Sequence, residues 1–188
     1  ITKDKLQNDP NLRVRGLINS SNVEFIGTTD DPVDSLEWHK KLAEDSNFDT
    51  LVCPSFRPDK ALNIDDPGFV GYLEALSQAA GVPAIENIQD VCVALTKRLD
   101  FFCEMGCRAS DHAFVNVQFM PSSEKLCNAI FKRAIDGGEV TPPERDMYQT
   151  YIMMHLGKEY AKRDIAMQIH YSCARNVNEK RHKELGVD

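Results

Sequence analysis

Four times along this chain, a short apolar or β-branched run leads into a cluster of polar and ionisable residues, and a helical pattern follows. The runs span residues 23–26, 50–53, 107–110 and 165–169. A strand buried on both faces is written in sequence as a continuous apolar run. In parallel α/β proteins, functional residues gather where such strands end. We therefore expect four strands whose ends together form one wall of an enzyme active site.

Helical spacing separates these runs. Apolar residues recur there at three- and four-residue steps, as on the buried face of an amphipathic helix. Gly106 fits a C-terminal cap, and Pro142 fits the first turn of a later helix. Strands joined by helices lie parallel with right-handed crossovers. The predicted helices span residues 34–44, 69–76, 87–105, 122–135 and 142–163.

This order of elements predicts an α/β fold. Four such units make up half of a closed eight-stranded barrel or a small open sheet, and the paired helices before the last two strands are more than plain crossovers need. No Pro-, Gly- or Ser-rich linker divides the chain, so residues 1–188 are predicted to be one domain. Because four units make only half a barrel, we expect a fragment of a longer enzyme.

Composition excludes several classes of protein. The chain has 188 residues, 42% of them hydrophobic, which suits one globular core. Its net charge of −7, with scattered basic residues, predicts no nucleic-acid partner. No apolar run reaches the roughly 20 residues of a membrane span. The six cysteines fall mostly within apolar patterns, so we expect reduced core residues in a soluble, cytoplasmic protein.

The sharpest polar cluster holds Arg57, Asp59 and Lys60, directly after the second run. A guanidinium offers a planar fork of donors that matches a carboxylate. We therefore predict an anionic substrate bound by Arg57 and Asp59. The alternative is a solvated turn in which Arg57 pairs with a neighbouring acid.

Three further candidate site residues, Asp111, His170 and Arg175, follow the third and fourth runs. Adjacent strand residues point to opposite faces, so only one of Asp111 and His112 can face the site, and Asp111 is favoured. His170 is placed for proton transfer or metal ligation, and Arg175 for a second polar group of the substrate. Structural roles are the alternative at each position. For Thr28 and Asp30, the simpler interpretation of packing and capping is preferred.

Known catalytic motifs narrow the class of enzyme. The sequence has no glycine-rich phosphate loop, nucleophile elbow or HExxH motif. These absences argue against kinases, nucleotide-dependent dehydrogenases, serine hydrolases and zincins. A barrel enzyme acting on a small, polar, anionic molecule remains.

At the same clusters the sequence resembles uronate isomerase (glucuronate isomerase), a family of (β/α)8 TIM barrels in the amidohydrolase superfamily. The resemblance rests on GTTDDPVDSLE (27–37), PSFRPDK (54–60), GCRASDH (106–112) and MQIH (167–170) running to RN (175–176). It implies interconversion of D-glucuronate with D-fructuronate and of D-galacturonate with D-tagaturonate. The chain would supply strands two to five of the barrel.

The resemblance also implies roles for individual residues. Arg57 matches the arginine that binds the uronate carboxylate, and His170 the histidine at the end of the fifth strand, next to a divalent metal such as zinc. Asp111 and Arg175 match further family positions. The His-x-His of the first strand and the Asp of the eighth have no counterpart. We therefore expect no metal and no activity in the chain alone, and isomerase activity in a longer parent.

Three expectations complete the prediction. Open sheet edges and an uncovered apolar face favour self-association into a homo-oligomer. A metal-dependent hydrolase of the same superfamily is an alternative function. A non-catalytic carbohydrate-binding fragment is another.

Overall fold

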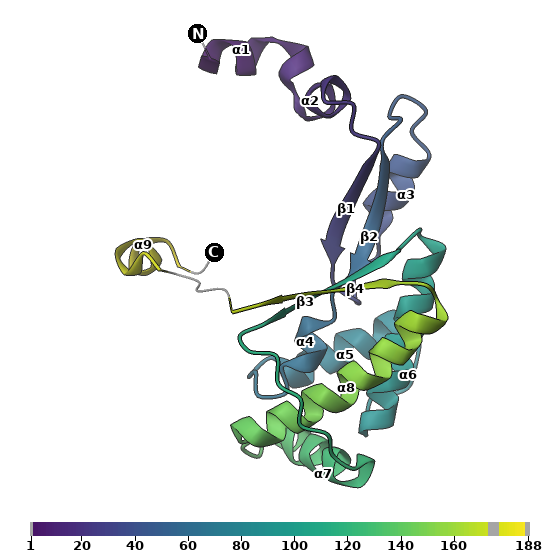
Figure 1. Ribbon diagram of the computed structural model, residues 1–188, viewed down its shortest axis with the longest axis vertical. Helices are drawn as coiled ribbons and strands as arrows, with labels where there is room; N and C mark the ends of the chain where they lie inside the picture. The colour runs from purple at the N-terminus through teal and green to yellow at the C-terminus, as the bar shows by residue number, and fades with distance from the viewer. Residues whose placement is uncertain (1, 173–176, 187–188) are drawn as a thin grey trace.

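A computed structural model describes residues 2–172 and 177–186 (Figure 1). Four strands form one sheet in the order β1-β2-β3-β4, and every neighbouring pair is parallel. This arrangement confirms the predicted parallel strands. They are β1 (Phe25–Asp30), β2 (Leu51–Phe56), β3 (Ala109–Phe114) and β4 (Ala166–Tyr171).

Each strand begins and ends later than the apolar runs predicted. The third shows this most clearly, because Asp111 and His112 lie within β3 rather than beyond it. Asp111 pairs with Gln168 in the ladder, and His112 pairs with Ile169. Ladder hydrogen bonds join backbone groups, and side chains point away from the plane of the sheet. A strand can therefore continue through residues with polar side chains.

The sheet is joined weakly at its centre. The β1–β2 and β3–β4 pairs are in register along their whole lengths, whereas β2 and β3 share the single pair Phe56 and Ser110. The two pairs of strands consequently cross at a steep angle (Figure 1).

Helices follow the predicted plan. Outside the five predicted spans lie the short helix α4, which precedes α5, and the elements α1, η1, α2 and α9 near the two ends of the chain. Helix α3 starts later than predicted, because Leu36 has a left-handed backbone (φ 52°) and interrupts the helical path before it. The helices are α1 (Thr2–Asn8), η1 (Pro10–Leu12), α2 (Val14–Ser20), α3 (Glu37–Ala43), α4 (Asp59–Leu62), α5 (Phe69–Ala80), α6 (Ile88–Glu104), α7 (Glu124–Ile135), α8 (Pro142–Lys162) and α9 (Glu179–Leu185).

Local chemistry explains several of these boundaries. At the start of α6, Asn87 and Asp90 form a reciprocal capping box. Gly81 ends α5 with a left-handed backbone (φ 58°), which glycine adopts without steric cost. None of the helices in the described part of the chain is long and apolar enough to cross a membrane.

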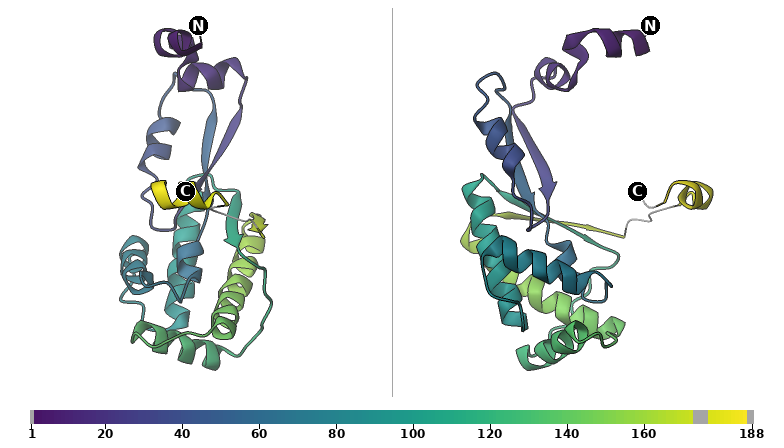
Figure 2. Two further views of the ribbon diagram at one scale, coloured as in Figure 1. Left: turned by 90° about the vertical axis from the view of Figure 1, so that its left-hand side faces the viewer. Right: turned by 180° about the vertical axis from the view of Figure 1, so that it is seen from behind.

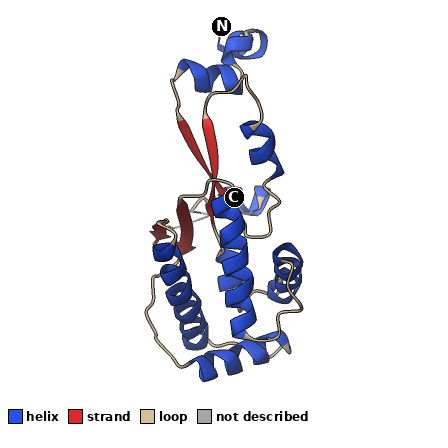
Figure 3. Cartoon of the chain, turned by 90° about the vertical axis from the view of Figure 1, so that its right-hand side faces the viewer, coloured by secondary structure: helices blue, strands red, loops and turns tan. Residues whose placement is uncertain are grey.

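The core lies on one side of the sheet. Helices α4, α5, α6 and α8 lie on one side of the β3–β4 pair, and α7 packs against α6 and α8 farther from the sheet (Figures 1 and 2), while α3 runs beside the β1–β2 pair (Figure 3). Phe56 of β2 meets Phe102 of α6 edge to face, with ring centres 5.1 Å apart. On the opposite side Phe25 and Leu51 are 53% and 58% exposed. The sheet therefore has one covered face and one open face.

Candidate functional site

Side chains from three neighbouring strands meet on the open face. Arg57 Nη1 lies 3.3 Å from Asp111 Oδ2, and His170 Nε2 lies 2.7 Å from Asp111 Oδ1. In the ladder Asp111 is opposite Gln168, so His170 two residues on shares its face. The polar ends of β2, β3 and β4 thus converge on one carboxylate, and the predicted Arg57, Asp111 and His170 come together.

The open face forms a hollow next to this cluster. Its volume is about 360 Å³. Asp111 is 6% exposed overall, while the His170 side chain is 61% exposed. A ligand in the hollow would reach the imidazole directly. The lining comes from all four strands and includes Gly27, Thr29, Ser55, Asp111, Gln168 and His170.

Asp59 holds Arg57 from the other side. Its Oδ2 accepts a hydrogen bond of 2.8 Å from Arg57 Nε, and the backbone N–H of Ala113 donates to the same carboxylate at 3.2 Å. Burial raises the pKa of Asp59, against the opposite effect of the Arg57 guanidinium. Both contacts are internal to the protein, so here Asp59 orients Arg57. A direct contact of Asp59 with substrate stays a prediction.

Arg57 keeps part of its donor fork for a ligand. Its contacts with described residues use Nε and Nη1, and Nη2 has no hydrogen bond or ion pair among residues 2–172 and 177–186. The neighbouring carboxylates raise the pKa of Arg57 above its ordinary value. The group therefore stays charged, as binding of an anion requires.

Beneath Asp59, on the covered face, lies a buried pair that sequence reasoning did not connect with the site. His112 is fully buried; its Nε2 lies 3.3 Å from the Tyr160 hydroxyl, and its Nδ1 lies 3.9 Å from Asp59 Oδ1. Burial lowers the pKa of His112 to about 4, so the ring is neutral at pH 7. The strand period separates His112 from Asp111, but only packing brings Tyr160 of α8 beneath it.

The polar cluster at the end of β1 is used for packing, as the simpler interpretation proposed. Thr28 Oγ1 lies 2.6 Å from Asp30 Oδ2 and 2.7 Å from Nε2 of the buried His39. The Asp31 carboxylate accepts from the Tyr72 hydroxyl at 2.9 Å. These contacts fasten α3 and α5 to the end of β1.

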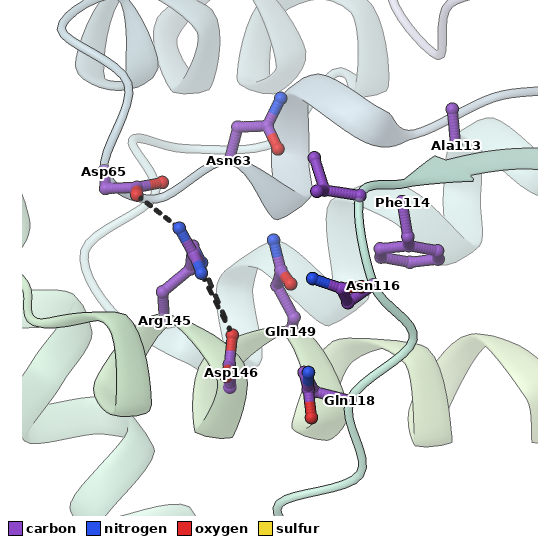
Figure 4. Close-up of a pocket in the computed structure, with 10 residues that line it drawn as sticks. Asn63, Asp65, Ala113, Phe114, Asn116, Gln118, Arg145, Asp146 and Gln149 are labelled. Atoms are coloured by element: carbon purple, nitrogen blue, oxygen red, sulfur yellow. Dashed lines mark hydrogen bonds and ion pairs between the residues drawn. The ribbon is translucent and has the colours of Figure 1, made fainter. Parts of the chain in front are cut away.

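A second hollow, of about 390 Å³, lies beyond the end of β3 (Figure 4). Amide side chains of Asn63, Asn116 and Gln149 surround it, and Arg145 pairs there with Asp65 and Asp146 at 3.2 and 3.4 Å. Its lining contains no imidazole. The open-face cluster is therefore the better candidate for acid–base chemistry.

The metal prediction concerns His170. Among residues 2–172 and 177–186, no group of three or more His, Cys, Asp or Glu side chains could hold a metal ion. His170 and Asp111 offer two donors, whereas a catalytic zinc site uses about three protein ligands. The described residues by themselves do not fit such a site. The predicted Arg175 lies outside the described residues.

Solved structures show the same fold. Uronate isomerase from Thermotoga maritima is 31% identical and superposes with a TM-score of 0.85 over 93% of this chain and 38% of its own. Glucuronate isomerase from Caulobacter crescentus, 24% identical, gives a TM-score of 0.86 over 100% of this chain and 38% of its own. The four strands are thus part of a (β/α)8 barrel, as predicted.

Sequence comparison gives the family. Uronate isomerase of Lachnospira eligens is 46% identical over 98% of this chain and 39% of its own length. The protein of the same name from Clostridium perfringens is 40% identical over 98% and 40%. The chain thus spans about two fifths of the length of these curated relatives. Residues 2–188 match the sequence profile of glucuronate isomerase, and the chain belongs to that family.

Proposed function

We propose that this chain supplies one wall of a uronate isomerase active site, formed by strands two to five of the barrel. The reaction is the reversible conversion of D-glucuronate to D-fructuronate and of D-galacturonate to D-tagaturonate. The observation that carries the proposal is the meeting of Arg57, Asp111 and His170 at neighbouring strand ends. Membership of the isomerase family supports it and leaves the hydrolase alternative without support.

The proposed roles follow from the chemistry of the side chains. Arg57 binds the substrate carboxylate through the donors that Asp59 and Asp111 do not occupy, because charge-assisted bonds to a guanidinium are strong and directional. Isomerisation of an aldose to a ketose moves a proton between adjacent carbons, which requires a base and an acid. Asp111 and His170, in contact at 2.7 Å, are the candidates for holding that proton.

The remaining part of the barrel belongs to this proposal. The curated relatives are about two and a half times as long as the match, and we assign turnover to a protein that contains the other strands. A divalent metal would take ligands from those strands together with His170. In the family such an ion would polarise the substrate oxygens.

Assembly and location complete the proposal. When this chain stands alone, the outer strands β1 and β4 each pair on one side only in the described sheet, and unpaired edges favour association. We expect a homo-oligomer in the cytoplasm, where the free cysteines stay reduced. Sedimentation velocity at increasing protein concentration tests the assembly; a monomer at every concentration contradicts it.

Calorimetric titration with D-glucuronate tests the role of Arg57. Arg57→Ala removes a charge-assisted contact worth about 1.5–3 kcal/mol, so we expect the dissociation constant to rise by about 10- to 100-fold. Arg145→Ala is the matched control, because Arg145 also lies between two carboxylates but lines the other hollow. It should change the constant by less than about twofold. Equal weakening by both substitutions, or no binding by the unmodified chain, contradicts the proposal.

A further inference from the structure

We propose that His112 is a positioning residue that fixes Asp59 and, through it, the Arg57 guanidinium. The inference rests on the proposed function only in taking Arg57 as the group that meets the substrate. Three contacts connect these residues across the sheet. Tyr160 lies against His112 at 3.3 Å, His112 against Asp59 at 3.9 Å, and Asp59 against Arg57 at 2.8 Å.

The His112 ring can carry its proton on either of two nitrogens, and its surroundings favour one of them. A neutral imidazole carries one N–H, on either nitrogen. His112 Nδ1 faces the Asp59 carboxylate and has no hydrogen-bond partner among the described residues. A lone pair on Nδ1 would face a negative charge inside the protein, where such repulsion is poorly screened. The proton therefore belongs on Nδ1, and Nε2 accepts from the Tyr160 hydroxyl.

His112 in this protonation state stabilises the Asp59 carboxylate. At 3.9 Å the His112 Nδ1–H is too far for a hydrogen bond, but its positive end lies near the carboxylate, where burial screens the interaction poorly. The backbone N–H of the next residue, Ala113, donates to the same carboxylate. Strand β3 thus presents two N–H groups to Asp59, one from a side chain and one from the backbone.

Asp59 in turn holds the Arg57 guanidinium in place. Asp59 is the first residue of the short helix α4, and its carboxylate accepts a hydrogen bond from Arg57 Nε–H. Without His112, the Asp59 carboxylate would be held only by the Ala113 N–H and by Arg57 itself, so both side chains would be held less firmly. His112 and Tyr160 thus act on Arg57 from the covered face without reaching the open face themselves.

Hydrogen exchange of the Arg57 Nε–H, followed by NMR, measures this directly and needs no substrate. The resonance is assigned by its loss in Arg57→Lys. His112→Leu removes the ring N–H, and we expect exchange to become about tenfold faster, as for loss of a contact worth about 1.4 kcal/mol. His112→Asn keeps an N–H near the position of Nδ1 and should stay within about threefold of the unmodified chain.

Two further variants keep the test decisive. Tyr160→Phe removes only the hydroxyl that fixes the ring, so exchange should be about threefold faster; this variant decides the matter if His112→Leu does not fold. His155→Leu is the control, because His155 contacts Thr96 at 2.9 Å, away from Asp59, and should leave exchange unchanged.

Two outcomes separate this inference from the proposed function. Unchanged Arg57 exchange in a folded His112→Leu chain, or in Tyr160→Phe where the first does not fold, overturns the role of His112. Faster exchange in a chain that binds no glucuronate contradicts the proposed function instead and supports the positioning role.

Discussion

Asp111 and His112 are neighbours on one strand, yet they belong to different parts of the molecule. Asp111 contacts Arg57 and His170 on the open face, while His112 is sealed beneath Tyr160 on the covered face. The contrast extends to the whole sheet. Leu99 and Phe102 on the covered side are completely buried, whereas Phe25 and Leu51 on the open side are more than half exposed. Packing thus concentrates on one face and candidate chemistry on the other.

The largest expected effect tests whether stability resides on the covered side. Leu99→Ala removes a fully buried side chain and should lower the free energy of unfolding by about 2–5 kcal/mol. Leu51→Ala makes the same change at a side chain that is 58% exposed and should cost less than about 1 kcal/mol. Urea denaturation measures both. Equal losses would show that the open face is packed in solution, as in a self-associated form.

A smaller effect tests whether buried polar contacts also hold the covered side. Arg98 of α6 is 8% exposed and donates to the backbone carbonyls of Pro32, Asp34 and Ala79 at 2.5, 2.8 and 3.0 Å. Arg98→Met leaves these carbonyls without their donor and should cost about 2–4 kcal/mol. The loop before α3 would then exchange its amide hydrogens faster.

Arg145→Met is the control for that substitution. The Arg145 side chain is 35% exposed, and its ion pairs should contribute less than about 1 kcal/mol. If Arg145→Met were as destabilising as Arg98→Met, burial would not be the property that distinguishes the two arginines.

The smallest expected effect is that two carboxyl groups, Asp59 and Glu144, change the stability of the protein in opposite directions as the pH rises. Burial raises the pKa of Asp59 above its ordinary value of 3.8, so its contribution to stability is complete below pH 3.8 and is lost as the pH rises through the folded-state pKa. The Arg133 side chain and the Thr141 cap lower the pKa of Glu144 from 4.5 to about 2. Its contribution is present above pH 4.5 and is lost as the pH falls towards 2.

Urea midpoints measured across the acid range separate the two groups. The unmodified chain should lose stability as Asp59 ionises with rising pH, and Asp59→Asn should abolish this loss. The unmodified chain should gain stability as Glu144 ionises with rising pH, and Glu144→Gln should abolish this gain. The slopes are compared rather than absolute stabilities, because Asp59→Asn also weakens the bond from Arg57. Slopes of the same sign would show that Asp59 is not desolvated in solution.

Several features could be predicted from the sequence because they depend on local chemistry. The predicted stop at Gly106, whose backbone is left-handed (φ 90°) just after α6, and the predicted start of α8 at Pro142 each act within one turn of helix. Strand ends were predicted less well, since the run at 107–110 was ended where the ionisable Asp111 and His112 begin, whereas both are buried and the ladder of β3 continues to Phe114. Pairing partners, not local composition, decide where a strand stops.

The order of strands and helices can be predicted from the amino-acid sequence, as can the period of two that separates Asp111 from His112, because both follow from the chemistry of adjacent residues. Packing between distant segments is what places Tyr160 of α8 against His112 and the Ala113 backbone of β3 against Asp59. Those contacts join residues far apart in the chain. They form only when parallel strands and their covering helices pack together, which no local pattern specifies.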